Sequence, residues 1–324
     1  MMRRKPMAPM VAIAVIILAV VNFARQRPAL KQETGSLVDA RNGFSTRLFA
    51  QQTDLNPVEV PPPGVFAIVQ YTTAAGALPA YLTPDPRDGK KHPAIVWITG
   101  GDCNSIGDVW SPAPASNDQS AAAYRKAGIL MMFPSLRGGN RNTGTKEGFL
   151  GEVDDVIAAT EFLAHLPYVD SAHIYLGGHS TGGTLAMLVA ECSDRYRAIF
   201  AFGPVADVSS YGPASGFLPF NFSDPQETKL RSPGYWLNCI RSPLWAFEGT
   251  AQGNIASLRA MAESNSNPKV SFIEVSGATH FSTLAATNAL IAQQIAQDTG
   301  AANSIHFTTE SASQNYRQFQ GGSQ

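Results

Sequence analysis

Short apolar runs alternate with amphipathic stretches through the middle of the 324-residue chain. The apolar runs have the length of strands and show no alternation with polar residues, which is typical of strands buried on both faces. These runs are 94–98, 129–133, 173–176, 199–202, 244–247 and 270–275. Helical spacing occurs between them, at 121–126, 152–166, 184–191 and 284–295. The alternation predicts an α/β protein with a mostly parallel, doubly wound sheet.

The pattern differs ahead of the first apolar run. Two strand-like segments, 66–71 and 78–82, flank a turn of small residues that contains Gly76. Two strands joined by so short a turn pair with each other, so the sequence predicts an N-terminal antiparallel hairpin.

The N-terminus departs from the composition of a soluble protein. Arg3, Arg4 and Lys5 precede a mostly apolar run, 7–21. A run of about 15 residues suits a signal peptide and is short for a membrane-spanning helix, which needs ~20 residues. Residues 1–25 are therefore predicted to be a signal peptide or a retained membrane anchor. In either case the rest of the chain is expected to be exported. It is membrane-anchored and faces the periplasm or exterior if the segment is retained, and it is secreted if the segment is cleaved.

Three further segments lack the alternation. Residues 26–64 are polar and end in three prolines, which predicts a stiff linker. Residues 211–238 are rich in Gly, Pro and aromatic residues, and they form either a short cap over an active site or a surface loop. Residues 299–324 are rich in Ser, Asn, Gln and Gly, which predicts a disordered polar tail. The folded domain is then expected over 65–298.

Charge and residue spacing exclude several classes of function. The chain has 24 basic and 25 acidic residues and a formal net charge of −1, so it offers no electrostatic footprint for nucleic acid. It has no metal-binding spacing such as C-x-x-C or H-E-x-x-H, and neither a metal nor another cofactor is expected. A small, roughly neutral substrate fits better.

The cysteines could form one disulfide bond. Cys103, Cys192 and Cys239 are too few for a disulfide framework, but an exported chain can form a single bridge. Cys192 follows the helical stretch 184–191, and Cys239 precedes the strand-like run 244–247. Both should lie at the same edge of the sheet, so Cys192–Cys239 is the candidate pair.

One serine stands where a strand meets a helix. The segment 178–182 reads Gly-His-Ser-Thr-Gly and lies between the apolar run 173–176 and the helical stretch 184–191. This strand–turn–helix setting is a nucleophile elbow, whose strained central residue needs small neighbours. The sequence therefore predicts Ser180 as a nucleophile.

His280 is the histidine placed to act as the base. Proteins with such an elbow carry the serine, the acid and the histidine in that order, with the histidine after the last strand. His280 follows the run 270–275 and precedes the final helical stretch. The other histidines lack this combination of order and place; they are His92, His165, His173, His179 and His306.

Two backbone N–H groups should form an oxyanion hole. One belongs to Thr181, directly after the serine, and the other to the loop after the first parallel strand. That loop contains paired glycines, which let the backbone approach a bound carbonyl group. Gly101 or Asp102 is the expected second donor.

The acid has two candidates. Gln252 occupies the place after the run 244–247 where many such proteins have an aspartate, and an amide cannot carry the negative charge that stabilises an imidazolium. Glu248 at the strand end and Asp207 after the preceding strand could each substitute. We rank Glu248 first and Asp207 second, and a site without an acid is the third alternative.

Arg137 follows the apolar run 129–133 and could either contact a substrate or lock its own loop. Locking is favoured, since the five donors of arginine suit loop carbonyls. Asp154 and Asp155 are expected to face solvent and to interact with the helix dipole.

Four motifs occur in an order that is specific to one group of hydrolases: PSLRGG at 134–139, GEVDDV at 151–156, GGHSTGG at 177–183 and GATHF at 277–281. The stretch from about 64 to 298 resembles the catalytic domain of the prolyl oligopeptidase family, and dienelactone-hydrolase-like enzymes look similar. The resemblance implies an α/β-hydrolase fold with Ser180 as nucleophile and His280 as base. The family's aspartate position falls on Gln252 here.

The residues and the resemblance together predict a serine hydrolase that cleaves an ester or amide bond through an acyl-enzyme on Ser180. Peptidase and carboxylesterase both fit, with a short peptide or a small-molecule ester as substrate. The alternative from another class is a noncatalytic, membrane-tethered binding protein that keeps the fold without its acid. A third alternative is acyl transfer to an alcohol or amine.

Overall fold

An eight-stranded sheet forms the centre of the computed structural model, which describes residues 30–212 and 218–322. Its order is β1-β2-β4-β3-β5-β6-β7-β8, with β1 and β2 antiparallel, β2 and β4 antiparallel, and every other pair parallel. The strands are β1 (Ala67–Thr73), β2 (Gly76–Leu82), β3 (His92–Ile98), β4 (Leu130–Pro134), β5 (Val169–His179), β6 (Ala198–Phe202), β7 (Leu244–Gly249) and β8 (Val270–Val275). The predicted sheet and its N-terminal hairpin are confirmed.

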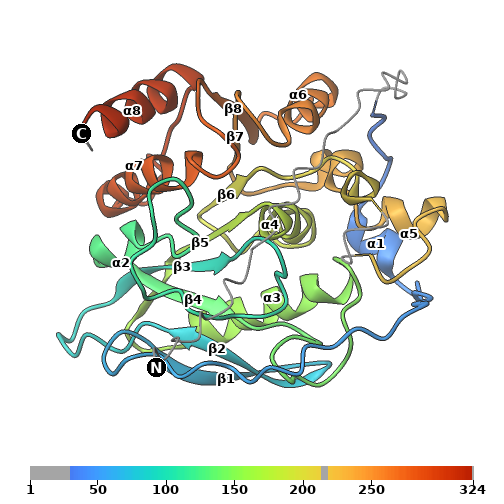
Figure 1. Cartoon of the computed structure of the whole chain (residues 1–324), viewed down its shortest axis with the longest axis horizontal. Coiled ribbons are helices and arrows are strands. Elements are labelled where there is room, and N and C mark those ends of the chain that lie inside the picture. The colour runs from blue at the N-terminus through green and yellow to red at the C-terminus, as the bar shows by residue number, and fades with distance from the viewer. Residues whose placement is uncertain (1–29, 213–217, 323–324) are drawn as a thin grey trace, which may run out of the picture.

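Helices cover both faces of this sheet (Figure 1). One face carries α1 (Leu37–Arg41), α3 (Gly151–Ala164), α4 (Thr181–Cys192) and α6 (Ile255–Ser264). The other carries α2 (Ala123–Lys126), α7 (Thr283–Gln297) and α8 (Thr309–Gly321). Along β3, Val96 and Ile98 belong to the first core and Ile95 and Trp97 to the second. Both sides of the strand are buried, which explains why its sequence is continuously apolar.

The parallel strands end at one edge of the sheet, and the loops that follow them carry the predicted site. Ser180 follows β5 directly, Gly203 follows β6, and Glu248 is the last residue but one of β7. His280 lies on the loop between β8 and α7. Ligands of open α/β sheets bind outside the carboxyl ends of the strands, so this edge is where the chemistry is expected.

The prediction of a disordered tail is wrong for the residues that the structure describes. The chain beyond residue 299 returns to the sheet and ends in α8, which begins with a capping box. Phe307 is buried, and its ring packs edge-on against Phe200, Trp245 and Phe247. The composition concealed this helix because a few apolar side chains, Ile305, Phe307 and Ala312, make the buried contacts. The helix α6 was also not predicted, and it buries Leu258 and Met261 alone.

The linker prediction is wrong for the described residues of 26–64. Leu37 of α1 is fully buried, and Leu48 forms an isolated bridge with Phe220. The N–H of Glu33 donates to the carbonyl of Tyr235 at 2.9 Å. Widely spaced apolar residues thus attach this polar segment to the domain. The predicted signal or anchor, 1–25, lies outside the described residues, and within the described ranges no helix is long and apolar enough to cross a membrane.

The predicted Cys192–Cys239 disulfide is not formed, because both thiols are free. Nη1 of Arg41 contacts Sγ of Cys192 at 3.6 Å, and Sγ of Cys239 donates to the carbonyl of Gly35 at 3.5 Å. Residues at the two ends of the segment 35–41 therefore contact the two sulfur atoms. The helix α1 of the predicted linker packs on the same face of the sheet as α4, next to the two cysteines, and the sequence does not reveal this position.

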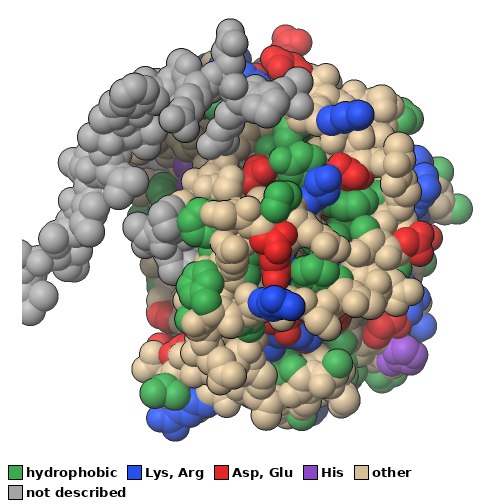
Figure 2. Space-filling view, turned by 90° about the vertical axis from the view of Figure 1, so that its right-hand side faces the viewer, with side chains coloured by type: hydrophobic (Ala, Val, Ile, Leu, Met, Phe, Trp, Pro, Cys, Tyr) green, Lys and Arg blue, Asp and Glu red, His purple; other side chains and the backbone are tan. Residues whose placement is uncertain are grey.

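Charges of both signs are interspersed on the face that Figure 2 turns to the viewer. The described residues form ion pairs such as Arg41–Asp154 at 3.3 Å and Lys229–Glu33 at 2.7 Å. The pattern agrees with the net charge of −1.

We predict that Phe307→Ala lowers the free energy of unfolding by about 3–5 kcal/mol, because it leaves a cavity among three aromatic rings. Phe49→Ala is the matched control, since the Phe49 side chain is 68% exposed, and it should cost less than about 0.5 kcal/mol. Urea unfolding measures both. Equal midpoints for the two variants would contradict the packing of residues 299–322 on the sheet.

Candidate active site

Ser180 has the strained backbone of a nucleophile elbow. Its φ is 56° and its ψ is −114°, at the junction of β5 and α4. Such a conformation costs a residue with a Cβ atom of order 1–3 kcal/mol and persists only where the surroundings enforce it. The N–H of Ser180 donates to the carbonyl of Phe202 at 2.7 Å. A Cβ atom on Gly182 would lie 2.2 Å from the carbonyl oxygen of Ile98, so only glycine allows this approach.

The structure places His280 against Glu248. Nδ1 of His280 lies 2.8 Å from Oε2 of Glu248, which is fully buried at the end of β7. A carboxylate oxygen accepts a hydrogen bond, so Nδ1 carries a proton, and in the neutral ring the lone pair is then on Nε2. The backbone N–H groups of Gly249 and Asn254 donate to Oε1 and Oε2 at 2.7 and 2.8 Å. Every oxygen of this buried carboxylate is therefore hydrogen-bonded.

Asp207 is committed elsewhere. Its Oδ1 accepts from the N–H of Ser209 at 2.8 Å, and its Oδ2 accepts from the hydroxyl of Tyr235 at 2.8 Å. Gln252, at the family's aspartate position, is exposed. Of the two candidate acids, Glu248 is the one that contacts His280.

Asn254 was not singled out in the sequence, yet it positions the acid. Its N–H holds Glu248, and its Nδ2 donates to the carbonyl of Gly203 at 2.8 Å. The sequence offers no signal for this role, because α6 was not predicted and the side chain of Asn254 makes no capping hydrogen bond to that helix.

The end of β6 borders Ser180 on one residue and His280 and Glu248 on the next. Phe202, the last residue of β6, accepts the hydrogen bond from Ser180, and Gly203 follows it with φ +57°. A Cβ atom on Gly203 would lie 2.3 Å from Cε1 of His280 and 2.9 Å from Oε2 of Glu248. The glycine leaves the room that the imidazole and the carboxylate occupy.

The predicted oxyanion loop, 99–104, packs on the elbow. The hydroxyl of Thr181 donates to the carbonyl of Gly101 at 2.9 Å. The N–H of Gly100 donates to Oε1 of Gln119 at 3.2 Å, so it is already committed. Thr181 is the first residue of α4, where a backbone N–H has no acceptor within the helix. Thr181 with Gly101 or Asp102 stays the predicted pair of oxyanion donors.

Arg137 locks its loop to α3, as the favoured alternative predicted. Its Nε and Nη2 donate to the two carboxylate oxygens of Asp155 at 2.9 and 2.8 Å, and its Nη1 donates to Glu147 at 2.7 Å. The exposure predicted for Asp155 is wrong, since this side chain is fully buried. The bidentate ion pair compensates the charge of both groups.

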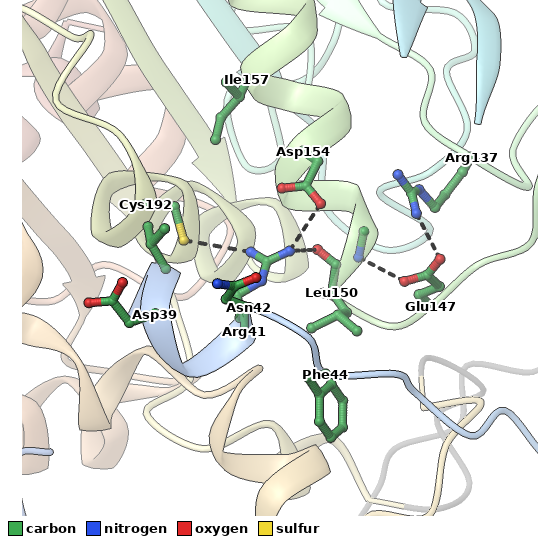
Figure 3. Close-up of a pocket in the computed structure, with 12 residues that line it drawn as sticks. Asp39, Arg41, Asn42, Phe44, Arg137, Glu147, Leu150, Asp154, Ile157 and Cys192 are labelled. Atoms are coloured by element: carbon green, nitrogen blue, oxygen red, sulfur yellow. Dashed lines mark hydrogen bonds and ion pairs between the residues drawn. The ribbon is translucent and has the colours of Figure 1, made fainter. Parts of the chain in front are cut away.

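A cavity of about 470 Å³ lies elsewhere, beside α1 and α3 (Figure 3). Its lining includes two ion pairs, Arg41 with Asp154 at 3.3 Å and Arg137 with Glu147 at 2.7 Å. Its lining includes none of the residues Ser180, His280 and Glu248. Within the described ranges, no group of three or more His, Cys, Asp or Glu could hold a metal ion.

The described residues of 211–238 include α5 (Pro225–Lys229) and two short 3-10 helices, η3 (Pro233–Tyr235) and η4 (Leu237–Cys239). The two 3-10 helices pack against α4, and Arg231 is fully buried with Nη2 donating to the hydroxyl of Thr46 at 2.7 Å. This part of the segment is an ordered layer on the domain. A cap over Ser180 stays a prediction.

Fold and site together define the α/β-hydrolase class, with a serine on an elbow and a histidine–carboxylate pair at the strand ends. Residues 115–229 match the prolyl oligopeptidase family. The matched segment contains the elbow and ends before Glu248 and His280.

One related sequence bears on the family match, and two solved structures bear on the fold. Prolyl oligopeptidase A of Amanita bisporigera is 33% identical over 111 residues, which are 32% of this chain and 13% of that protein. The structure of 2,6-dihydroxy-pseudo-oxynicotine hydrolase is 14% identical with a TM-score of 0.58, covering 75% of this chain and 71% of that one. A puromycin-hydrolyzing peptidase of Mycobacterium tuberculosis is 17% identical with a TM-score of 0.56, covering 74% and 40%.

These likenesses confirm the α/β-hydrolase fold and the resemblance to the prolyl oligopeptidase family. Residues 115–229 are thus similar to the prolyl oligopeptidase family, and the domain as a whole has the α/β-hydrolase fold. It spans only a small part of the curated relative that it matches.

Proposed function

We propose that the protein hydrolyses the amide bond of a short peptide, or a small-molecule ester, through an acyl-enzyme on Ser180. The observation that carries the proposal is the 2.8 Å hydrogen bond between Nδ1 of His280 and Oε2 of Glu248, at the strand ends that also carry the strained Ser180. A serine hydroxyl is a weak nucleophile until a positioned base removes its proton, and this pair supplies that base.

In the proposed reaction, Nε2 of His280 takes the proton of the Ser180 hydroxyl as its oxygen attacks the substrate carbonyl carbon. The N–H groups of Thr181 and of Gly101 or Asp102 stabilise the oxyanion. The imidazolium then donates its proton to the leaving amine or alcohol. Water, activated by the same imidazole, releases the acid and regenerates the serine. Glu248 holds the imidazole in the Nδ1–H tautomer and stabilises its positive charge.

The related proteins support a peptide as the substrate class. One is named a prolyl oligopeptidase, and one is a puromycin-hydrolyzing peptidase. The noncatalytic alternative rested on the absence of an acid at Gln252, and the contact of Glu248 with His280 weakens it. Acyl transfer would require a site from which water is excluded, which the cap of 211–238 would have to provide.

A fluorophosphonate probe is expected to label the wild-type protein at Ser180 and to leave folded Ser180→Ala unlabelled. The probe reports the activated nucleophile whatever the natural substrate is. Circular dichroism checks that both proteins are folded, and mass spectrometry of the labelled peptide identifies the site. A folded wild-type protein that stays unlabelled would favour the noncatalytic binding protein.

We expect Glu248→Gln to lower kcat for a p-nitrophenyl ester by about 10²–10⁴-fold, because the amide cannot stabilise the imidazolium. Asp207→Asn is the matched control: it also neutralises one carboxylate after a neighbouring strand, and it should change kcat less than about tenfold, since Asp207 bonds Ser209 and Tyr235. Steady-state kinetics measures both. The opposite ranking would transfer the role to Asp207.

We further propose that the chain is exported, with the catalytic domain outside the cytoplasmic membrane. Residues 1–64 fused to a reporter enzyme that is active only outside the cytoplasm should give active reporter, and deletion of 7–21 should abolish it. A carbonate wash of the membranes separates a retained anchor from a cleaved signal. Equal reporter activity with and without 7–21 would refute export through this segment.

A further inference from the structure

His179 lies next to the serine, and no step of the proposed reaction uses it. It is fully buried, and its ring centroid lies 4.5 Å from that of His280. Nε2 of His179 lies 3.1 Å from the backbone carbonyl oxygen of His280. A carbonyl oxygen can only accept, so Nε2 carries the proton of the ring. The burial of the ring and the nearby His280 lower the pKa of His179 to about 3. The ring is neutral at pH 7, and its Nδ1 must accept a hydrogen bond.

Gln119 supplies that hydrogen bond. Its Nε2 lies 2.8 Å from Nδ1 of His179 and also 2.8 Å from Oδ1 of Asn117, so both amide hydrogens have an acceptor. Its Oε1 accepts from the N–H of Gly100 at 3.2 Å. A flipped amide would direct the oxygen at two acceptors and the NH₂ group at a donor. Oε1 of Gln119 also lies 3.3 Å from Nδ1 of His179, farther than Nε2, so the amide NH₂ group is the partner of this nitrogen.

A continuous chain of hydrogen bonds thus crosses the site. It runs from the N–H of Gly100 to Gln119, from Gln119 to His179, and from His179 to the carbonyl of His280. The glycine is needed at the first position, because a Cβ atom on Gly100 would lie 2.7 Å from Nδ1 of His179 and 3.3 Å from Cβ of Ser180. The oxyanion loop and the loop of His280 come from distant parts of the sequence. This series of hydrogen bonds joins them through His179, the residue before Ser180.

We propose that His179 and Gln119 are positioning residues that hold the oxyanion loop and the loop of His280 in a fixed position relative to each other. The inference rests on the proposed hydrolytic function. The N–H of Gly100 is held by Gln119, which fixes the peptide that leads into Gly101. The carbonyl of His280 is held by His179, which fixes the backbone from which the imidazole projects. Loss of either residue lets the oxyanion donors and the base move independently.

The kinetic test compares three variants. Gln119→Ala and His179→Phe should each lower kcat by about 10–100-fold with KM changed less than about threefold, because small misplacements of catalytic groups act on the transition state. Phenylalanine keeps an aromatic ring beside His280 and Phe281 but makes no hydrogen bond. His179→Gln restores one donor and one acceptor, and it should recover part of kcat relative to His179→Phe.

Gln294→Ala is the matched control. Gln294 also holds a loop through its side-chain amide, since Nε2 donates to the carbonyl of His306 and Oε1 accepts from its N–H. It lies in α7, outside the proposed site. We expect it to lower the thermal midpoint without a change in kcat. A kcat for Gln119→Ala and His179→Phe equal to that of wild type would overturn the positioning role.

Nuclear magnetic resonance of protein labelled with ¹⁵N-histidine supplies a readout independent of turnover. One imidazole should remain neutral in the Nε2–H tautomer from pH 8 to about pH 5, and its signals should be absent from His179→Gln. An imidazole of His179 that titrates in this range, or carries its proton on Nδ1, would overturn the hydrogen-bond chain.

The two proposals fail in different ways. If Ser180→Ala retains full activity, the proposed nucleophile is wrong, and the imidazole spectrum still decides whether the chain of hydrogen bonds exists. If Ser180→Ala is inactive while Gln119→Ala keeps its kcat, only the positioning role is refuted.

Discussion

The strained backbone of Ser180 is the constraint on which the rest of the site depends. The conformation is maintained because α4 is buried along almost its whole length, so the helix cannot withdraw to relax its first turn. On the strand side, the carbonyl of Phe202 holds the N–H of Ser180, and the glycines of the elbow let β3 and β6 approach closely. The same strand end, at Gly203, borders His280 and Glu248. The geometry of the serine and that of its partners are thus set by one packing arrangement.

The central fold was predictable because its signals are local and repeated. Each parallel strand is a continuous apolar run, and the glycine-rich turn around Ser180 needs no knowledge of distant contacts. The tail and the linker were not predictable from composition. Their attachment depends on single apolar residues, such as Leu37 and Phe307, whose partners lie far away in the sequence. A composition that cannot form its own core can still complete the core of another segment.

The site shows the same division. Ser180 and His280 could be placed from chain order, since each lies at a recognisable strand end. The choice between Glu248 and Asp207 required the distances, because Glu248 lies at the end of β7 and Asp207 follows the neighbouring β6, and only Glu248 contacts the imidazole. The side chains of Gln119, Asn254 and His179 contribute through hydrogen bonds to backbone groups. Such contacts leave no spacing pattern, and for that reason sequence reasoning missed them.

The contacts of α8 have a consequence for protein synthesis. The N–H of Ser276 donates to Oγ of Ser313 at 2.9 Å, and the hydroxyl of Tyr316 lies 3.0 Å from Oγ of Ser282, so α8 holds both ends of the loop that carries His280. A nascent chain translated as far as residue 300 already contains Ser180, Glu248 and His280. It lacks the helix that braces the histidine. Maturation of the site is therefore coupled to translation of residues that carry no recognisable motif.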